Sequence, residues 1–100
     1  MTVLNDSANI NYIMELAYEL QKIGLSHKEA KVYLANLELG QSSVQNIAKK
    51  ASVNRATTYV ILNSLIEKGL CSTFMQNKKT FYAASDPEQL ETIFETQKNI

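Results

Sequence analysis

The spacing of apolar residues predicts two amphipathic helices in the first forty residues. From about residue 10 to 23, apolar side chains recur at intervals of three and four, the period of a helix with one buried face. Gly24 ends this helix, since glycine tolerates the left-handed conformation of a helix end. Ser26 and Glu29 stand three residues apart, the spacing of a reciprocal cap at a helix start. The second helix is therefore predicted to run from this cap to Gly40.

Two further helices, separated by a tight turn, are predicted in the middle of the chain. The third begins at Ser42 or Ser43 and ends near Ala51, and residues 52–54 form a break in which Asn54 is a good N-cap. The fourth runs over residues 55–68, until Gly69. Its expected core face is Thr58, Leu62, Leu65 and Ile66, with Tyr59 at the margin; its expected outward face is Ala56, Thr57, Val60, Asn63, Ser64 and Glu67. Two helices joined by a tight turn within about 25 residues form a helix-turn-helix, here about residues 43–68.

After Gly69 the pattern becomes that of strands. Residues 70–75 and 80–84 are rich in β-branched and aromatic side chains, and the four polar residues 76–79 join them, which predicts a hairpin over about 70–84. Asp86 and Pro87 are the N-cap and first position of a last helix over about 87–100. The predicted fold is mainly α with a small β-hairpin: a winged helix-turn-helix with additional N- and C-terminal helices, forming one domain over residues 1–100.

Composition excludes several classes of protein. The chain of 100 residues is 45% apolar and 20% charged, as in an ordinary soluble domain. It has neither a run of about eighteen apolar residues nor a recognisable signal peptide, so we expect no membrane association. Its one cysteine, Cys71, excludes an internal disulfide and indicates a cytoplasmic protein. One His, one Cys and two Asp, without a Gly-rich phosphate loop or metal-ligand spacing, predict no enzyme activity, metal or cofactor.

The net charge is zero, but positive charge is concentrated in the centre of the sequence. Residues 40–85 carry six cations against Glu67 alone, a net charge of +5, whereas residues 1–39 carry −2 and residues 86–100 carry −3. A local basic surface matters more to a polyanion than the overall sum. A solvated surface would explain the same lysines, and their positions alone do not decide between the two. The six are Lys49, Lys50, Arg55, Lys68, Lys78 and Lys79.

Several short motifs stand in one order along the chain: residues 24–26 (GLS), 29–34 (EAKVYL), 47–48 (IA), 55–59 (RATTY) and 65–70 (LIEKGL). In this order they resemble the N-terminal domain of the TrmB-like transcription regulators, over about residues 16–90. The resemblance implies operator binding as a dimer, with Arg55 and its neighbours in the DNA-contacting helix. Larger members carry a C-terminal sugar- or effector-binding domain that has no counterpart in these residues, so no small-molecule effector is evident and the resemblance does not imply a maltose-type ligand.

A winged helix of this kind would place the N-terminal half of its second motif helix in the major groove and the wing lysines on phosphates. Arg55 stands at a helix start, where the helix dipole disfavours a cation. This unfavourable position and the family resemblance favour a DNA contact over an ordinary surface role for Arg55. For Thr57, Val60 and Asn63, an ordinary exposed helix face is an equal alternative, and for Tyr59 half-buried packing is an equal alternative. The candidate DNA-binding residues are Ser43, Lys49, Lys50, Asn54, Arg55, Thr57, Thr58, Tyr59, Val60, Asn63, Lys78 and Lys79.

Three further hypotheses follow from the sequence. The terminal helices have more apolar surface than a small core needs, which suggests a homodimer, although they could simply cover the core. A rival function is a winged helix that binds protein instead of DNA, favoured by Val60 and Glu67 on the outward face. Cys71 is interpreted as a small apolar strand residue in preference to a redox switch. The candidate dimerisation residues are Ile10, Ile13, Met14, Ala17, Leu90, Ile93 and Phe94.

Overall fold

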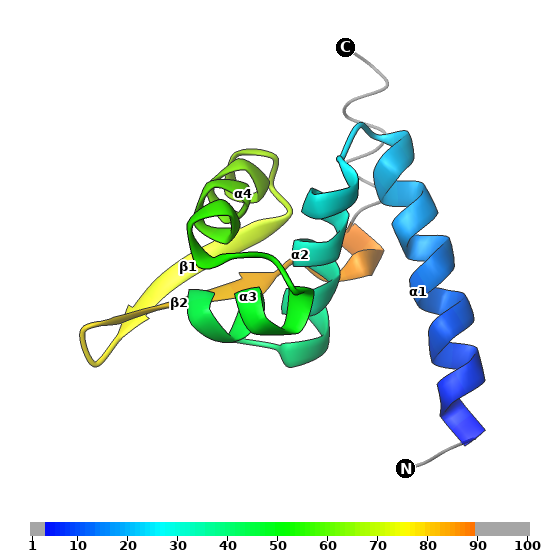
Figure 1. The fold of residues 1–100 in the computed structure, drawn as a ribbon, viewed down its shortest axis with the longest axis horizontal. Coiled ribbons are helices and arrows are strands. Elements are labelled where there is room, and N and C mark those ends of the chain that lie inside the picture. Colours follow the sequence, from blue (N-terminus) through cyan, green and yellow to red (C-terminus); the bar gives the residue numbers. More distant parts are fainter. Residues whose placement is uncertain (1–3, 90–100) are drawn as a thin grey trace.

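The computed structural model describes the backbone of residues 4–89 and the side chains of residues 12–88. Four helices come first: α1 (Leu4–Lys22), α2 (His27–Leu39), α3 (Val44–Ala51) and α4 (Arg55–Glu67). The strands β1 (Cys71–Gln76) and β2 (Lys79–Ala84) follow, and then a short 3-10 helix, η1 (Pro87–Gln89). Figure 1 shows the hairpin extending away from the cluster of α2, α3 and α4, with α1 on the opposite side. The predicted winged helix-turn-helix fold is confirmed.

The helix starts follow from side-chain caps. The Oγ of Ser26 accepts from the Glu29 N–H at 3.1 Å, and the Glu29 Oε1 accepts from the Ser26 N–H at 2.8 Å, which completes the predicted capping box of α2. Ser43 caps α3 by accepting from the Asn46 N–H at 3.2 Å. Asn54 caps α4 by accepting from the Thr57 N–H at 2.8 Å. These three predicted boundaries are therefore set by local hydrogen bonds that the sequence already encodes.

The core lies around α2, which packs against α1, α3, α4 and β2. The core side chains come from α1, α2, α3 and α4 and from both strands near the base of the hairpin, so a single core holds these elements together. Burial of large apolar side chains supplies its stability, at roughly 1.5–3 kcal/mol for each fully buried Leu, Ile or Val. The fully buried apolar residues include Leu20, Val32, Ile47, Leu62, Leu65 and Leu70.

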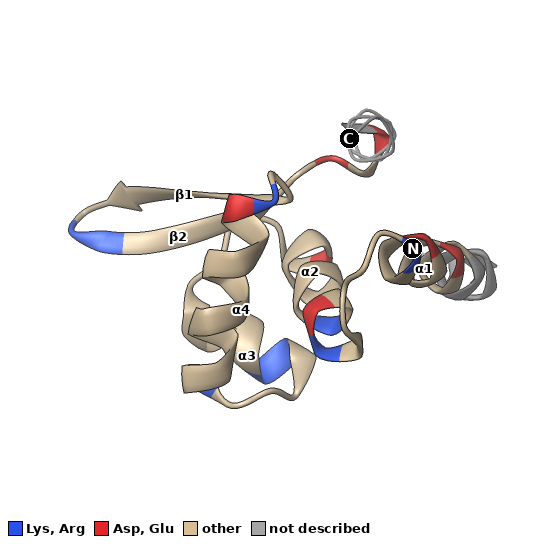
Figure 2. Cartoon of the chain, turned by 90° about the horizontal axis from the view of Figure 1, so that it is seen from above, with Lys and Arg blue, Asp and Glu red and all other residues tan. Residues whose placement is uncertain are grey.

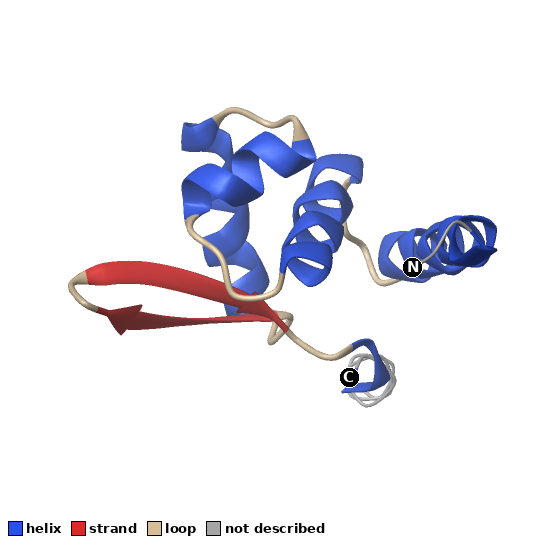
Figure 3. Cartoon of the chain, turned by 90° about the horizontal axis from the view of Figure 1, so that it is seen from below, coloured by secondary structure: helices blue, strands red, loops and turns tan. Residues whose placement is uncertain are grey.

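The wing differs from its prediction in the turn. Gln76 and Lys79, expected in a four-residue loop, pair with each other in the antiparallel ladder, so the turn contains only Asn77 and Lys78. Both have positive φ, 55° and 66°, as a type I′ turn requires to match the twist of its strands. A bridge between Ser42 and Tyr82 adds a third backbone segment beside β2. Figure 3 shows the two strands emerging together from beneath the helices.

The terminal elements correct two predictions. α1 begins at Leu4, about six residues before the predicted start, because no glycine or proline interrupts residues 4–10. Among its described side chains, from residue 12 onward, Leu16 and Leu20 are buried, whereas Met14, expected on the apolar stripe, is 64% exposed. Ile13 and Ala17 are half-buried. α1 therefore faces α2 along a stripe that is rotated from the predicted one.

The predicted C-terminal helix is described only at its start. The Glu88 N–H donates to the Asp86 Oδ1 at 2.9 Å, so Asp86 caps the turn that begins with Pro87, as expected. The candidate dimerisation residues Leu90, Ile93 and Phe94, and the side chain of Ile10, lie outside the described residues. Within the described part of the chain, no helix combines the length and the apolar character needed to cross a membrane.

Candidate nucleic-acid interface

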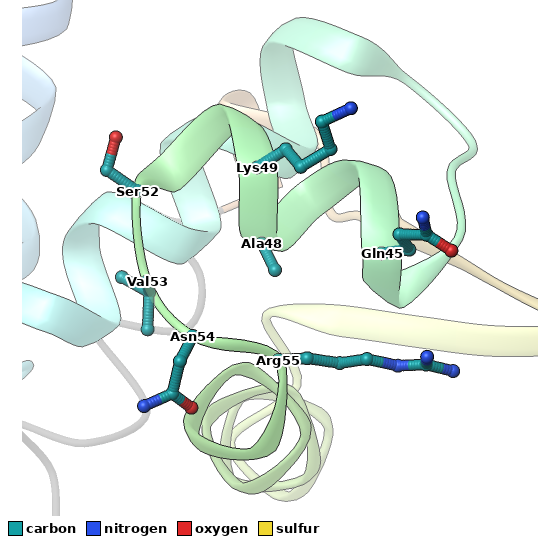
Figure 4. A pocket seen from close by; sticks show the side chains of 7 residues that line it. All are labelled: Gln45, Ala48, Lys49, Ser52, Val53, Asn54 and Arg55. Carbon is teal, nitrogen blue, oxygen red and sulfur yellow. The ribbon is translucent and has the colours of Figure 1, made fainter.

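The turn between α3 and α4 holds the two helices of the motif in a fixed relation. Ser52 takes the left-handed conformation, and the buried Val53 donates its N–H to the Ala48 carbonyl at 3.1 Å. The side chains around this turn border an open hollow of about 290 Å³. In Figure 4, Ala48 points toward α4, whereas Lys49 points away from it. The lining residues are Gln45, Ala48, Lys49, Ser52, Val53, Asn54 and Arg55.

The outward face of α4 is exposed and makes few internal contacts. Val60 is 68% exposed and Tyr59 is 41% exposed, while Arg55 and Asn63 are also exposed. Thr57 is half-buried beside them. Among residues 12–88, the side chains of Arg55, Tyr59 and Asn63 form no hydrogen bond with another residue. Their polar groups are therefore available to a partner.

Thr58 is a correction to the predicted set. Its side chain is fully buried, and its Oγ1 donates to the Asn54 carbonyl at 2.8 Å and lies 3.4 Å from the Val53 carbonyl. Its position on the core stripe of α4, next to Ile61 and Leu62, removes it from the surface. The expectation that the Thr58 side chain contacts DNA is therefore wrong, and its role is to hold the first turn of α4. Ile61, which the predicted core face omitted, is also buried.

The six central cations fall into two groups. Lys50 lies 3.5 Å from Glu38, and Lys68 lies 3.1 Å from Glu29, so each of them is paired with a carboxylate. In the part of the chain with described side chains, no carboxylate pairs with the other four within 4.0 Å. Figure 2 shows Lys and Arg at the hairpin tip, on α3 and at the start of α4, with acidic residues on α1 at the other side. The four unpaired cations are Lys49, Arg55, Lys78 and Lys79.

Glu29 joins α2 to α4, a role that its cap position alone did not reveal. Its Oε2 accepts from the Ser64 hydroxyl and from the Lys68 ammonium, both at 3.1 Å. Burial raises the pKa of this carboxyl, but the hydrogen bonds from the Ser26 backbone, Lys68 and Ser64 outweigh it, so the net pKa is lowered. Ser64, predicted to face outward, is half-buried against this carboxylate. The C-terminal end of α4 is thus tied to α2, whereas the outward face of α4 remains exposed.

Asn36 is a second polar residue that the sequence analysis did not single out. It is 1% exposed, and its Nδ2 donates to the Gly40 carbonyl at 3.1 Å and the Tyr82 carbonyl at 3.2 Å. Its Oδ1 accepts from the Cys71 thiol at 3.4 Å. The available signal was its position three residues after Tyr33, on the buried face of α2, because a polar residue on an apolar stripe needs internal partners.

Cys71 lies at the start of β1 with its side chain in the core. It is 5% exposed, and burial raises the pKa of its thiol to about 11. Thiol nucleophilicity requires the thiolate, which this environment suppresses at neutral pH. The structure therefore supports the small apolar strand residue over the redox switch.

A helix-turn-helix, a two-stranded wing and unpaired cations beside an exposed helix face together define the winged helix of a transcription regulator. A family model described as "Sugar-specific transcriptional regulator TrmB" matches residues 20–88. The chain therefore belongs to the TrmB family, as the motif resemblance predicted.

Individual relatives agree with this assignment. The chain is 32% identical to the HTH-type sugar sensing transcriptional regulator TrmBL1 of Pyrococcus furiosus over 74 residues, which are 74% of this chain and 21% of TrmBL1. The structure of the archaeal chromatin protein TrmBL2 is similar with a TM-score of 0.75 and 26% identity, over 87% of this chain and 35% of TrmBL2. The chain thus spans about a fifth and about a third of these relatives.

A more distant neighbour shows the fold alone. A MarR family regulator from Silicibacter pomeroyi is 16% identical with a TM-score of 0.64, covering 96% of this chain and 67% of that one. The helix-turn-helix with a wing is thus shared well beyond the TrmB family.

Proposed function

We propose that this chain is the DNA-reading domain of a transcription regulator that binds double-stranded DNA through α4 and the wing. The observation that carries the proposal is the coincidence of two features on one part of the molecule. On the outward face of α4, Arg55, Tyr59 and Asn63 form no hydrogen bond among the described residues. The unpaired cations of the described residues lie on α3, at the start of α4 and at the hairpin tip (Figure 2). The relative TrmBL2 is itself a DNA-binding chromatin protein.

In this proposal α4 enters the major groove, where base edges present distinguishable patterns. Asn63 can pair with adenine, and the methyl groups of Thr57 and Val60 can meet a thymine methyl. Arg55 can contact a phosphate or donate hydrogen bonds to the edge of a guanine. Tyr59 can donate its hydroxyl to a phosphate.

The wing and the helix starts would contribute phosphate contacts. Lys78 and Lys79 at the hairpin tip face solvent and would reach the backbone beside the groove. Lys78 occupies a positive-φ turn position that usually favours glycine or asparagine, so a lysine there is conformationally strained. A phosphate contact would compensate for this strain. The free N–H groups at the capped starts of α3 and α4, at Ser43 and Asn54, would add neutral contacts. Lys49 and Lys50 would add electrostatic attraction to the phosphates, and the contribution of Lys50 would be smaller because it is paired with Glu38.

We also propose that the domain dimerises through its terminal helices. Tyr12, Met14 and Tyr18 on α1 are 51%, 64% and 63% exposed, an apolar surface that α2 does not cover. A winged helix domain from Mycobacterium bovis with a similar fold, at 15% identity and a TM-score of 0.58, is homodimeric. We expect a dimer at tens of micromolar in sedimentation velocity and a shift to monomer in Met14→Lys. A wild-type monomer at that concentration would contradict this arrangement.

A second function has a specific observation in its favour. Val60, Tyr59 and Met75, the last on the wing at 69% exposure, place apolar surface beside the cations. Such surface also suits a protein partner, as in a winged helix that binds protein instead of DNA.

Salt dependence of DNA binding separates the two functions. We would titrate random-sequence duplex with the protein by fluorescence anisotropy at several salt concentrations. DNA binding predicts that log K falls with log salt by about 0.9 for each phosphate contacted, because bound cations release counterions. Lys78→Ala with Lys79→Ala should reduce the slope by about 1.8, the share of two contacts. Arg55→Ala should weaken binding by about tenfold, if it makes one charged contact.

A charge-matched control localises the surface. Lys22→Ala with Lys28→Ala removes two exposed cations from α1 and α2, and should leave both affinity and slope unchanged. Equal effects of the two double variants would show a general charge attraction without the proposed docking. Absence of binding at low salt would overturn the DNA function in favour of the protein partner.

A further inference from the structure

Asn36 connects α2 and the residue that follows it to both strands of the wing, whose contact residues are 35 and 46 positions away in the sequence. It belongs to α2, donates to Gly40 in the α2–α3 connection and to Tyr82 in β2, and accepts from Cys71 in β1. The geometry points to Asn36 as a positioning residue that sets the direction of the wing relative to α4, so that the tip lysines meet the DNA. This inference rests on the proposed function and assigns it a residue that touches no DNA.

The wing is attached to the body at two points along its length. At its base, the Tyr33 hydroxyl donates to the Ser85 carbonyl at 2.7 Å. Three residues further along, Tyr82 and Ser42 exchange backbone hydrogen bonds of 2.8 and 3.0 Å. Asn36 reinforces this second point, because its amide bonds both to Tyr82 and to the segment that carries Ser42. Besides the packing of Cys71 and Tyr82 in the core, these two hydrogen-bonded points constrain the direction of the hairpin more than the base alone would.

A pivot about the base would be amplified at the tip. At roughly 3.3 Å per residue, Tyr82 lies roughly 10 Å from Ser85 along the strand, and Lys78 lies roughly 23 Å from it. A displacement of about 1 Å at Tyr82 therefore becomes about 2 Å at Lys78. Such a shift is comparable with the difference between a made and a broken hydrogen bond. Lys78 and Lys79 would then lose their phosphates while α4 remained in place.

Asn36→Leu tests this role without leaving unsatisfied groups. The Tyr82 carbonyl still accepts from the Ser42 N–H, and the Gly40 carbonyl still accepts from the Ser42 hydroxyl at 2.9 Å. The Cys71 thiol can turn its single proton to the Ser72 carbonyl, which lies 3.6 Å from its sulfur. Since each partner of the lost amide retains one bond, we expect the variant to fold, which circular dichroism and thermal unfolding would verify.

The first measurement needs no DNA. Amide hydrogen exchange by NMR reports the opening of the Ser42–Tyr82 bridge, whose two N–H groups are the probes. In Asn36→Leu both should exchange at least tenfold faster relative to Ile47 and Leu65, which lie in the helical core. Thr73→Val is the matched control, because the Thr73 hydroxyl bonds only within the hairpin, to the Phe81 carbonyl at 3.2 Å. Unchanged exchange in Asn36→Leu would overturn the inference.

The second measurement is the salt slope of DNA binding. Asn36→Leu should lower the slope toward that of the Lys78→Ala and Lys79→Ala variant, and adding it to that variant should cause no further reduction, whereas Thr73→Val should keep the wild-type slope. A wild-type slope in Asn36→Leu, or full additivity with the lysine variant, would overturn the positioning role. If the lysine variant itself keeps the wild-type slope, the proposed wing contact fails and this role with it. That failure is distinguishable, because the exchange experiment judges the attachment of the wing separately.

Discussion

Helices α2 and α4 have the same length, 13 residues, and opposite uses of their polar side chains. On α2, the side chains of Glu29, Tyr33 and Asn36 all end in hydrogen bonds to other parts of the fold. On α4, the outward Tyr59 and Asn63 form no such bond within the described residues, although both are exposed. These polar groups of α2 hold the domain together, whereas those on the outward face of α4 have no internal partner among the described residues.

The difference separates two kinds of substitution. A polar residue of α2 should affect the free energy of unfolding first and DNA affinity only through geometry. A polar residue on the outward face of α4 should affect affinity and leave the free energy of unfolding almost unchanged. Equal responses of the two helices to such substitutions would contradict this difference. The three substitutions that follow are ordered by their expected cost in stability.

Asn36→Asp should have the largest effect. The substitution keeps the shape of the side chain but turns two donors into a carboxylate facing the Gly40 and Tyr82 carbonyls, in a site that is 1% exposed. An uncompensated buried charge costs about 3–5 kcal/mol. Urea unfolding at neutral pH measures it. Asn46→Asp, on an exposed position of α3, is the control and should change stability little.

The contrast with Asn36→Leu sharpens this prediction. The apolar variant removes the hydrogen bonds without adding charge, so it should be markedly more stable than Asn36→Asp. A cost below about 1 kcal/mol for the aspartate would mean that the site opens to water more readily than its burial indicates.

The same two helices show what the sequence could predict. The boundaries of α4, its cap at Asn54 and most of its core face follow from local pattern, because each depends on residues within one or two turns. The partners of Glu29 and Asn36 could not be predicted, since Lys68 and Tyr82 are 39 and 46 residues away in the sequence. A helix cap depends on residues three positions apart, whereas a buried polar network depends on the tertiary fold.

The candidate site divides in the same way. The exposure of Val60 and the hairpin itself were predicted from periodicity, but periodicity could not show that Lys50 and Lys68 are paired with carboxylates. Thr58 was placed both on the core face and among DNA contacts, and the tertiary structure decides for the core. For the wing, a polar composition predicts a loop, but only the backbone conformation fixes its length at two residues.

Glu29→Gln is expected to have an intermediate effect and to depend on pH. Glutamine retains the cap of α2 but loses the charge that faces Lys68, at a cost of about 1 kcal/mol near pH 7. Because the pKa of Glu29 is lowered in the folded protein, its contribution is complete above its ordinary pKa of 4.5 and is lost as the pH falls through the lowered value. The stability difference between wild type and variant should therefore narrow below pH 4.5.

The control for Glu29 is the other central ion pair. Glu38 and Lys50 are 3.5 Å apart with side chains 40% and 49% exposed, so water screens their attraction. Glu38→Gln should change stability far less than Glu29→Gln at neutral pH. If Glu29→Gln and Glu38→Gln reduced the thermal stability equally at pH 7, the Glu29–Lys68 pair between α2 and α4 would stabilise the fold no more than an exposed surface pair.

Asn63→Ala, on the open face of α4, should have the smallest effect on stability and thereby complete the comparison. Its side chain is exposed and has no hydrogen-bond partner in the described structure, so the free energy of unfolding should change by no more than about 0.5 kcal/mol. If Asn63 reads a base, affinity for a duplex selected from a random pool should fall by about 1–3 kcal/mol, while affinity for unselected duplex should stay near the wild-type value. A uniform loss on both duplexes would assign Asn63 to the phosphate backbone. No loss on either would place the specific contacts elsewhere on α4, although the stability measurement would still distinguish this helix from α2.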